Sequence, residues 1–364
     1  MYYKIKQIID DACLTQNFSG TVLVKHGDEI LFETACGFAH KGFQLSNRID
    51  TMFDTASVTK VFTATRILQL IENGMLRFDD RITALIDLNG TEIPDDVTIY
   101  HLLTHTSGIA DDADEEAGED YAELFIDKPN YSLRSTIDYL PQFVFKKPNF
   151  KAGANVRYNN CAFILLGLVI EKLTGEDYRS NIVRCIFEPC GMKNSKFCAM
   201  DEINPNTAEG YCALYDENQR ITRYKKNIYS YPPIGAPDGG AYSTVHDLDR
   251  FLCGLKSGRL LSKEYVQMLF EPHCEFSQPY RAWKNVPAGT LFNGYAFEFV
   301  RIGKQTYMMK KDGMNAGVRA MLSYFPQTDI TIIMLCNQDC NIWTIHRDIQ
   351  SVLYSAVPVS PDNR

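Results

Sequence analysis

The sequence predicts an α+β fold in which one antiparallel β-sheet is built from both ends of the chain. Segments with strand composition lie near the N-terminus and again in the last third, whereas residues 80–195 look mainly helical. Apolar residues recur at helical spacing over residues 2–16, and a further helix is expected over 342–354. We therefore expect terminal helices packed on the sheet, a helical subdomain inserted in the middle, and a cleft between the two halves.

The individual elements follow from local patterns. Residues 20–24 and 30–35 form a predicted hairpin, because His26-Gly27-Asp28 between them is typical of a turn. One helix is expected from Ser57 to a stop at Gly74, and another from near Asn160 to Gly175. The further strands are expected at 292–302, 306–310, 320–325 and 330–336. We expect a single domain over 1–364, in which 1–55 and 238–364 form the sheet part and 56–237 the helical part.

The composition excludes several classes of protein. Of the 364 residues, 45% are hydrophobic and 23% charged, which is ordinary for a globular domain with a core. The net charge of −8 argues against a nucleic-acid partner, which requires a basic face. The longest apolar stretch, Cys161 to Ile170, is about half as long as a bilayer span, so we expect no membrane span. The N-terminal segment is charged throughout, and we expect a cytoplasmic protein unless a leader has been removed.

The cysteines and acidic residues predict neither a metal site nor a cofactor. The 11 cysteines are an odd number in a large chain and include no C-x-x-C pair, so we expect them to be reduced, buried and structural. Cys336 and Cys340 are close enough in sequence to form a bridge. The acidic run 111–120 lacks convincing metal-ligand spacing. We expect it to be a solvated loop, with a mobile lid over the cleft as the alternative.

The first chemical motif is S-x-x-K, formed by Ser57 and Lys60 at the start of a predicted helix. Positions i and i+3 share a helix face, so the amine can reach the hydroxyl. The N–H groups at a helix N-terminus stabilise a developing oxyanion, and a partly desolvated lysine becomes a usable base. The tetrapeptide alone is weak, because a helix-capping serine followed by a surface lysine has the same sequence.

Two further motifs follow in order, and together they favour a catalytic role for Ser57 and Lys60 over a structural one. Tyr158-Asn159-Asn160 is a Y-x-N just before an apolar helix, and Lys311-Asp312-Gly313 is a K-x-G in what we expect to be an edge strand. A glycine in a strand allows a ligand backbone to approach closely. The ordered set S-x-x-K, Y-x-N and K-x-G resembles the serine β-lactamase and penicillin-binding-protein superfamily. The tyrosine makes the chain similar to the class C branch, which also holds esterases and D-amino-acid peptidases.

Other segments extend the resemblance over most of the chain. They are Phe53 to Lys60 around the nucleophile, His101 to Gly108, Pro189 to Met192, and Gly239 to Thr244. The resemblance implies a β-lactamase/transpeptidase-like fold and one catalytic domain. His105 lies in the second of these segments, and we interpret it as a buried structural histidine rather than a catalytic one.

The resemblance also implies a role for each motif residue. Ser57 is the expected nucleophile, Lys60 the base that takes its proton, and Tyr158 the group that passes the proton to the leaving group and later activates water. Asn160 is expected to hold Lys60 and to contact the substrate.

The third motif is expected to complete the substrate site. Lys311 is expected to lower the pKa of Tyr158 and bind a substrate carboxylate or carbonyl, beside Gly313. The backbone N–H groups of Ser57 and Met314 are expected to form the oxyanion hole.

The implied activity is hydrolysis of a small ester, amide or β-lactam through an acyl-enzyme. Asp312 replaces a neutral hydroxyl residue of the β-lactamases, so we expect a carboxylesterase or a D-amino-acid amidase or peptidase rather than an efficient β-lactamase. Adjacent strand residues point to opposite faces, so Asp312 is expected either to face away from the cleft or to be turned inward by a bulge. The alternative function is a catalytically silent binding protein that retains the fold.

Overall fold

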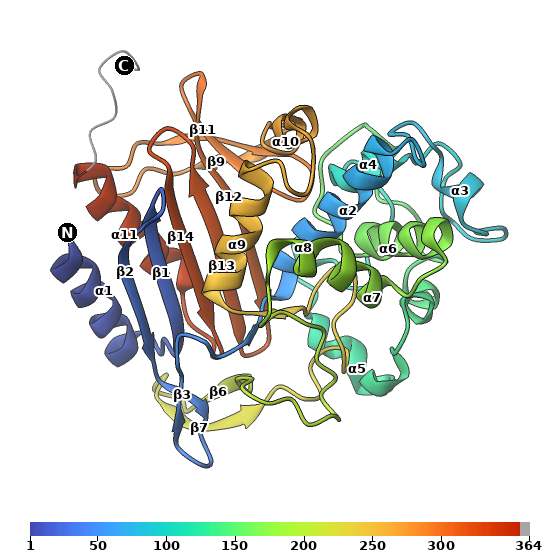
Figure 1. Cartoon of the computed structure of the whole chain (residues 1–364). Helices are drawn as coiled ribbons and strands as arrows, with labels where there is room; N and C mark the ends of the chain where they lie inside the picture. The colour runs from blue at the N-terminus through green and yellow to red at the C-terminus, as the bar shows by residue number, and fades with distance from the viewer. Residues whose placement is uncertain (357–364) are drawn as a thin grey trace.

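The structure, a computed structural model, describes residues 1–356, and an antiparallel eight-stranded sheet dominates this part of the chain. Its strand order is β2-β1-β14-β13-β12-β11-β10-β9, so the first and last strands of the sequence are neighbours. Figure 1 shows these blue and red strands side by side, which confirms that both ends of the chain build one sheet. The strands are β1 (Gly20–His26), β2 (Glu29–Cys36), β9 (Cys274–Tyr280), β10 (Gly289–Asn293), β11 (Glu298–Ile302), β12 (Gln305–Asn315), β13 (Val318–Phe325) and β14 (Ile330–Cys336).

Alternate residues of the central strands face two separate hydrophobic clusters, as the period-two geometry of a strand requires. Val22 and Ile332 belong to a cluster shared with the terminal helices, whereas Leu23 and Ile333 belong to the larger cluster on the other face. In Figure 1, α1 and α11 cover one face of the sheet and α9 crosses the opposite face. These helices are α1 (Tyr2–Thr15), α9 (Val245–Lys256) and α11 (Ile342–Ala356).

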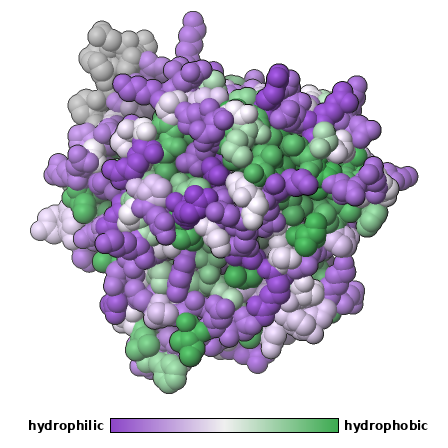
Figure 2. All heavy atoms as spheres, turned by 45° about the vertical axis from the view of Figure 1, so that its right-hand side comes forward, coloured by the Kyte–Doolittle hydropathy of each residue, from purple (hydrophilic) through white to green (hydrophobic). Residues whose placement is uncertain are grey.

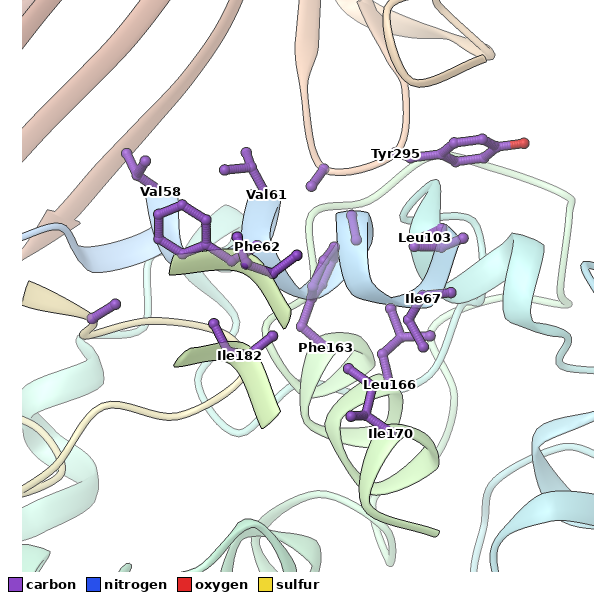
Figure 3. Close-up of a cluster of buried hydrophobic side chains, with 14 of the residues drawn as sticks. Val58, Val61, Phe62, Ile67, Leu103, Phe163, Leu166, Ile170, Ile182 and Tyr295 are labelled. Carbon is purple, nitrogen blue, oxygen red and sulfur yellow. The ribbon is translucent and has the colours of Figure 1, made fainter. Parts of the chain in front are cut away.

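The larger cluster continues into a helical half built around α2 (Lys60–Glu72) and α6 (Cys161–Thr174). Figure 3 shows Ile67 of α2 beside Leu166 of α6, while Phe62 packs edge-on against Phe187 and Phe251. The elements of residues 80–195 are helices, as expected, but all except α6 are short. The short helices of the chain are α3 (Ile82–Leu85), α4 (Ile99–Leu103), α5 (Leu124–Asp127), α7 (Tyr178–Ile182), α8 (Glu188–Cys190), α10 (Lys263–Leu269), the 3-10 segments η1 (Ala56–Thr59), η2 (Glu115–Ala117), η3 (Tyr121–Glu123), η4 (Asn130–Ser132) and η5 (Thr136–Gln142), and the π segment η6 (Val183–Phe187).

Small strand pairs also lie outside the main sheet. β5 pairs with β8 beside the nucleophile turn, β3 pairs with β4, and β6 pairs with β7. Their bounds are β3 (Phe38–His40), β4 (Leu45–Ser46), β5 (Phe53–Asp54), β6 (Tyr211–Tyr215), β7 (Ile221–Lys226) and β8 (Tyr242–Ser243). In Figure 2 the helical half comes forward, and hydrophobic residues form separate patches on a largely hydrophilic face.

One expected strand was wrong, and two helices were missed. Residues 292–302 form a hairpin of β10 and β11 rather than one strand, because Ala296 adopts a φ of 65° and Gly294 N–H bonds Phe297 O at 2.8 Å. The aromatic composition of the turn hid its Asn-Gly signal. Helices α9 and α10 were also not anticipated, although Leu248, Phe251 and Leu255 of α9 recur at helical spacing.

The cysteines and helices agree with the expected absence of a disulfide framework and of a membrane helix. Within residues 1–356 all 11 cysteines are free thiols, but six of them are only half-buried rather than buried. Cys336 and Cys340, for which a bridge was suggested, are free thiols whose Sγ atoms lie 3.5 Å apart. In the same range, no helix combines the length and the apolar character that crossing a bilayer demands.

Candidate active site

The sequence predicts that Ser57 begins an α-helix, but in the structure a strained 3-10 turn presents this residue. It is the second residue of η1, and α2 begins only at Lys60. Ala56 adopts a φ of 44°, in the left-handed region that a non-glycine residue rarely occupies. The carboxylate of Asp54 accepts the Ala56 N–H at 2.7 Å and so stabilises this conformation. Ser57 is half-buried, while its neighbours from 51 to 60 are buried.

Two glycine-containing segments enclose the nucleophile turn. A Cβ on Gly313 of β12 would lie 2.5 Å from Thr55 O and 2.8 Å from Ser57 N. On the other side, Gly240 N–H donates to Ala56 O at 3.2 Å. The glycine of the K-x-G motif therefore leaves room for the protein's own nucleophile turn.

The K-x-G motif lies in a strand that is interior at its start and open at its end. β12 pairs with β11 from Gln305 to Lys310 and with β13 from Met309 to Asn315, so from Lys311 onward it pairs with β13 alone. The expected edge strand is therefore confirmed only for the motif itself. This open side is where β12 meets η1.

Side chains from the first two motifs converge on the Ser57 hydroxyl. Lys60 Nζ lies 3.2 Å from Ser57 Oγ, and the Tyr158 hydroxyl donates to the same oxygen at 2.8 Å. Lys60 is fully buried and also donates to Asn160 Oδ1 at 2.7 Å and to the carbonyl oxygen of Asp238 at 2.6 Å. Helix α6 begins at Cys161, so its N-terminus places the Y-x-N segment opposite α2.

Lys311 reaches the same place from the sheet. Its ammonium lies 4.7 Å from the centroid of the Tyr158 ring, and its side chain is almost wholly buried. The carboxylate of Glu298 on β11 lies 2.6 Å from Lys310 Nζ and 3.5 Å from Lys311 Nζ, so the two lysines share its charge. The motif residues Ser57, Lys60, Tyr158, Asn160 and Lys311 are thus brought together in one site, with Gly313 packed against its turn.

Asp312 points away from this site. Asp312 binds Lys310 Nζ at 3.0 Å and accepts the Trp343 indole N–H at 2.5 Å, on the α11 side of the sheet. Of the two orientations considered for Asp312, the structure therefore shows the outward one. Although burial opposes it, the positive charges of Lys310 and Lys311 hold the pKa of Asp312 below its usual range. The Met314 side chain is 49% exposed.

The electrostatics assign different protonation states to Lys60 and Tyr158. Burial lowers the pKa of Lys60 to about 8, against the opposing charge of Asp238 and with help from Lys311. Burial, followed by the charge of Glu115, raises the pKa of Tyr158 well above its usual value. The expected lowering of the Tyr158 pKa is therefore wrong, because burial and the charge of Glu115 dominate.

The acidic run is hydrogen-bonded to the Y-x-N segment rather than being a purely solvated loop. Glu115 Oε1 accepts from Asn160 Nδ2 at 3.0 Å, and Glu116 Oε1 accepts from the Tyr158 N–H at 3.0 Å. The buried carboxylate of Asp111 accepts the Asn160 N–H at 2.9 Å and caps α6. The loop therefore covers the motif that positions Tyr158.

His105 occupies a buried position behind Tyr158. Its Nδ1 accepts the Asn159 N–H at 3.2 Å, and its ring centroid lies 4.8 Å from that of Tyr158. Burial, with the nearby charges of Lys311 and Lys60, lowers its pKa well below the usual value, so the ring is neutral. This environment suits the structural interpretation of His105.

One buried group has the atom types of a metal site. Ligand-type atoms of Asp111, Asp112 and Cys161 lie within 4.8 Å of one another. The atoms are used for structure, however: Asp111 accepts the backbone N–H groups of Asn160 and Cys161, and Cys161 Sγ accepts the Asp112 N–H at 3.2 Å. Burial also raises the pKa of both carboxyl groups, which disfavours the charged form that a metal requires.

A small cavity of about 30 Å³ opens beside Ser57, and sequence reasoning missed most of its wall. Asp238 directly precedes the Gly239-Gly240 pair that the motif analysis singled out, and that position was the available signal. The tyrosines of the wall could not be distinguished among the 20 tyrosines of the chain. The lining residues are Ser57, Glu115, Tyr121, Tyr139, Asn160, Tyr231, Pro232, Ile234, Gly235, Ala236, Asp238, Gly239, Gly240 and Asn315.

Known proteins resemble the chain in sequence. Penicillin-binding protein 4 of Amycolatopsis lactamdurans is 31% identical over 191 residues, which is 51% of this chain and 46% of that protein. Esterase EstB of Burkholderia gladioli is 30% identical over 208 residues, covering 54% of this chain and 52% of that protein. The matched region thus spans about half the length of these curated relatives.

Solved structures resemble the chain over nearly its whole length. A penicillin-binding protein from Bacillus halodurans is 33% identical with a TM-score of 0.85, over 96% of this chain and 99% of that one. The D-amino acid amidase from Ochrobactrum anthropi SV3, in complex with D-phenylalanine, is 20% identical with a TM-score of 0.74, over 97% and 98% of the two chains, and so shares the fold. The model of the family described as Beta-lactamase matches residues 7–352. The chain therefore belongs to the Beta-lactamase family, whose expected motifs are assembled around Ser57.

Proposed function

We propose that this protein is a serine hydrolase that cleaves an ester or amide through a covalent acyl-enzyme on Ser57. The observation that supports this most directly is that Ser57 Oγ lies within hydrogen-bond distance of both Lys60 Nζ, at 3.2 Å, and the Tyr158 hydroxyl, at 2.8 Å. A serine with a base and a proton-carrying partner in contact, next to a cavity, is the arrangement that nucleophilic catalysis requires.

Lys60 is the proposed general base. A neutral amine has two N–H donors and one lone pair, and the three partners of Nζ match this set. Asn160 Oδ1 and Asp238 O can accept the two donors, which leaves the lone pair for the Ser57 hydroxyl. The pKa of about 8 makes the neutral form accessible near physiological pH.

Tyr158 is the proposed proton donor to the leaving group. Its raised pKa keeps the phenol protonated. When Ser57 Oγ attacks the carbonyl, its proton passes to Lys60. When the tetrahedral intermediate collapses, the C–O or C–N bond breaks and Tyr158 gives its proton to the departing atom, after which the ammonium of Lys60 restores the phenol. Water then repeats the sequence on the acyl-enzyme.

The proposed oxyanion hole consists of the backbone N–H groups of Ser57 and Met314. Asn315 and Val318 close a two-residue turn, and residues of an antiparallel pair alternately bond to and face away from the partner strand. Met314 is therefore expected to direct its N–H away from β13, towards the open side of β12. Two such donors at the developing oxyanion would supply electrostatic stabilisation of the transition state.

Asn160, Lys311 and Gly313 complete the proposed substrate site. Asn160 orients Lys60 through its Oδ1 atom, and Lys311 provides a cation for a substrate carbonyl or carboxylate. Gly313 allows β12 and the nucleophile turn to approach each other.

The proposed substrates are those of a carboxylesterase or a D-amino-acid amidase or peptidase rather than those of an efficient β-lactamase. The esterase among the relatives and the amidase among the similar structures support this choice. The argument from Asp312 does not, since that residue faces away from the site. A structural reason comes instead from Glu298, which weakens the attraction of Lys311 for an anionic β-lactam.

The test is covalent labelling combined with a substrate panel. Purified protein is treated with a fluorophosphonate and with labelled penicillin, and adducts are mapped by mass spectrometry. The panel contains chromogenic esters, D-amino-acid amides and a chromogenic cephalosporin. We expect an adduct on Ser57, and a loss of turnover of about 10³-fold or more in Ser57→Ala.

Ser132→Ala is the matched control, because Ser132 is exposed and its hydroxyl bonds only the carbonyl of Pro129. It should react as the wild type does. A wild-type protein that forms no adduct and turns over no substrate would instead be the catalytically silent binding protein.

A further inference from the structure

Two cysteine thiols lie side by side where β14 ends and the chain turns towards α11. Cys340 Sγ donates to Cys336 Sγ across 3.5 Å, and Cys336 is fully buried at the last position of β14. A disulfide requires the two sulfur atoms to lie about 2 Å apart, so they need to approach each other by roughly 1.5 Å. The mechanism proposed at Ser57 uses neither thiol.

The segment that joins the two cysteines is fixed to its surroundings. The Asn337 side chain donates to the carbonyl oxygen of Phe38 at 2.9 Å and to that of Glu209 at 2.8 Å. The Asp339 carboxylate pairs with the guanidinium of Arg319 at 3.2 Å. These contacts hold the backbone between the thiols in place, so the two sulfur atoms are positioned in advance for reaction with each other.

The hydrogen bond between the two thiols gives them different acidities. Although burial opposes it, the Cys340 thiol and the positive charge of Arg319 lower the pKa of Cys336. The same hydrogen bond, together with burial, raises the pKa of Cys340 well above its usual value. The pair therefore loses its first proton as a unit, and the remaining proton lies on the hydrogen bond between the two sulfur atoms. A thiolate is the nucleophile in disulfide chemistry, so this pair is suited to it.

A surface groove gives solvent access to this pair. The groove has a volume of about 760 Å³, and its wall includes Cys340, Asp339 and Arg319 together with Cys13 of α1. Cys340 is half-buried, whereas Cys336 is buried and does not belong to the wall. A small oxidant in the groove therefore meets Cys340 first, and Cys336 is the adjacent thiol that can react with the product.

The arrangement does not favour a metal shared by several cysteines. The thiols of Cys13 and Cys36 pack against the same hydrophobic cluster as the pair. Within residues 1–356, however, Asp111, Asp112 and Cys161 form the one group in which three ligand-type atoms lie within 4.8 Å of one another. A structural metal centre requires about four converging ligands. The thiols beside the groove therefore suit a bond between two sulfur atoms rather than a metal centre.

We propose that Cys336 and Cys340 form a reversible oxidation site, at which a hydroperoxide converts the two thiols into a disulfide. The Cys340 proton passes to Cys336 along the hydrogen bond between them while the Cys340 sulfur attacks the O–O bond. An S–O bond forms, the O–O bond breaks, and the departing oxygen takes a proton from solvent and leaves as an alcohol, or as water when the oxidant is hydrogen peroxide. Cys336 then attacks the sulfenic sulfur, an S–S bond forms, and the sulfenic oxygen leaves as water. The two sulfur atoms together lose two electrons, which the peroxide accepts.

The second thiol determines what oxidation does to this part of the sheet. A sulfenic acid without a neighbouring thiol is oxidised further to sulfinic and sulfonic acids, which cellular thiols do not reduce. Cys336 instead traps the sulfenic acid of Cys340 as a disulfide, which other thiols return to the reduced state. The end of β14 is thereby protected from irreversible oxidation, whether or not the protein is a hydrolase.

The test follows a single tryptic peptide. Residues 320–347 are released by cleavage after Arg319 and Arg347, and they contain Cys336 and Cys340 but no other cysteine. Purified protein is treated with hydrogen peroxide, the remaining thiols are alkylated in denaturant, and the peptide is analysed by mass spectrometry. We expect it to lose two hydrogen atoms, to take up no alkylating reagent, and to recover both thiols after treatment with dithiothreitol.

Single variants separate the roles of the two thiols. In Cys336→Ser the sulfenic acid of Cys340 has no thiol to trap it, so it should react with dimedone and otherwise proceed to sulfinic acid. Cys340→Ser keeps a hydrogen-bond donor in place but removes the thiol of the groove wall, so Cys336 should stay reduced. Cys185→Ser is the matched control, because it removes a half-buried thiol from η6 in the helical half. It should form the disulfide as the wild type does.

An equilibrium measurement tests the geometry independently of access to the groove. Native and urea-unfolded protein are incubated in glutathione buffers of graded redox ratio, and the disulfide fraction of the same peptide is measured. Because native contacts hold the thiols together, their effective concentration should be about tenfold or more higher in the native protein. An equal or lower value in the native protein would overturn the proposal. So would a wild-type protein in which peroxide gives sulfinic acid on Cys340, or a disulfide from Cys340 to Cys13, without the Cys336–Cys340 bond.

Discussion

Gly313→Ala should disable the site by moving Ser57, because β12 and the nucleophile turn leave no space for a methyl group. The added Cβ would lie 2.5 Å from Thr55 O, 2.8 Å from Ser57 N and 3.0 Å from Ala56 Cβ, whereas ordinary contacts begin at 3.4 Å. The turn must therefore move by several tenths of an ångström. Overpacking of this kind costs about 1–3 kcal/mol of unfolding free energy.

The catalytic effect should be larger than the stability effect suggests. Misplacement of reacting groups by about 1 Å costs about 10²-fold in rate, so we expect the acylation rate to fall about 10- to 100-fold. The assay is the rate of Ser57 labelling by a fluorophosphonate, with urea unfolding measured on the same samples.

Gly254→Ala separates the loss of stability from the loss of acylation rate. Its Cβ would lie 2.3 Å from Cys190 Sγ in the helical half, away from the site, so it should lower stability without lowering the labelling rate of the folded protein. Gly239→Ala, whose nearest contact is 3.5 Å away at Ala56, should cost little stability. If Gly313→Ala labels at the wild-type rate, the tight contact does not position Ser57.

The remaining predictions concern the charged and polar groups. The rate of Ser57 labelling should rise with pH through about 8, because only the neutral form of Lys60 accepts the proton. Lys311→Met should move this rise to higher pH, since the charge of Lys311 helps to lower the pKa of Lys60, and a flat profile from pH 6 to 9 in the wild type would contradict Lys60 as the base. Tyr158→Phe should slow acylation and deacylation together by about 10²-fold in single-turnover assays, and a near-wild-type kcat would leave Lys60 as the only proton path. Asp312→Asn should leave the ester-to-cephalosporin ratio of kcat/KM unchanged while lowering unfolding free energy in urea by about 1–3 kcal/mol, and a shifted ratio would mean that Asp312 acts on the substrate.

Local patterns predicted the parts of the fold that depend on short-range geometry. The first hairpin was recognisable from the turn at Gly27, and the ends of α2 and α6 from Gly74 and Gly175, which adopt φ values of 70° and 69°. The β10–β11 turn was missed because its aromatic residues, such as Tyr295, pack into the core as strand residues do. Pairing of β1 with β14 could be anticipated only as a consequence of strands at both ends.

In the candidate site, too, residues with a recognisable motif were predicted, and features that depend on distant contacts were not. The motifs identified Ser57, Lys60 and Tyr158 because each carries its chemistry in its own side chain. Asp238 was missed because its contact with Lys60 is made by a backbone carbonyl, which every residue possesses. The protonation state of Tyr158 was predicted wrongly because it depends on burial and on Glu115, which approaches from a loop far away in the sequence.

The neighbouring positions of β1 and β14 determine when the sheet can be completed during synthesis. Ser19, next to β1, bonds Asn337, next to β14, across a separation of 318 residues. The first hairpin therefore leaves the ribosome long before its partner strand exists, with one edge of β1 unpaired in the meantime. Such long-range pairing slows folding, and an open edge is a template for association with other chains. Protection of this edge until β14 has been made would therefore favour correct assembly of the sheet.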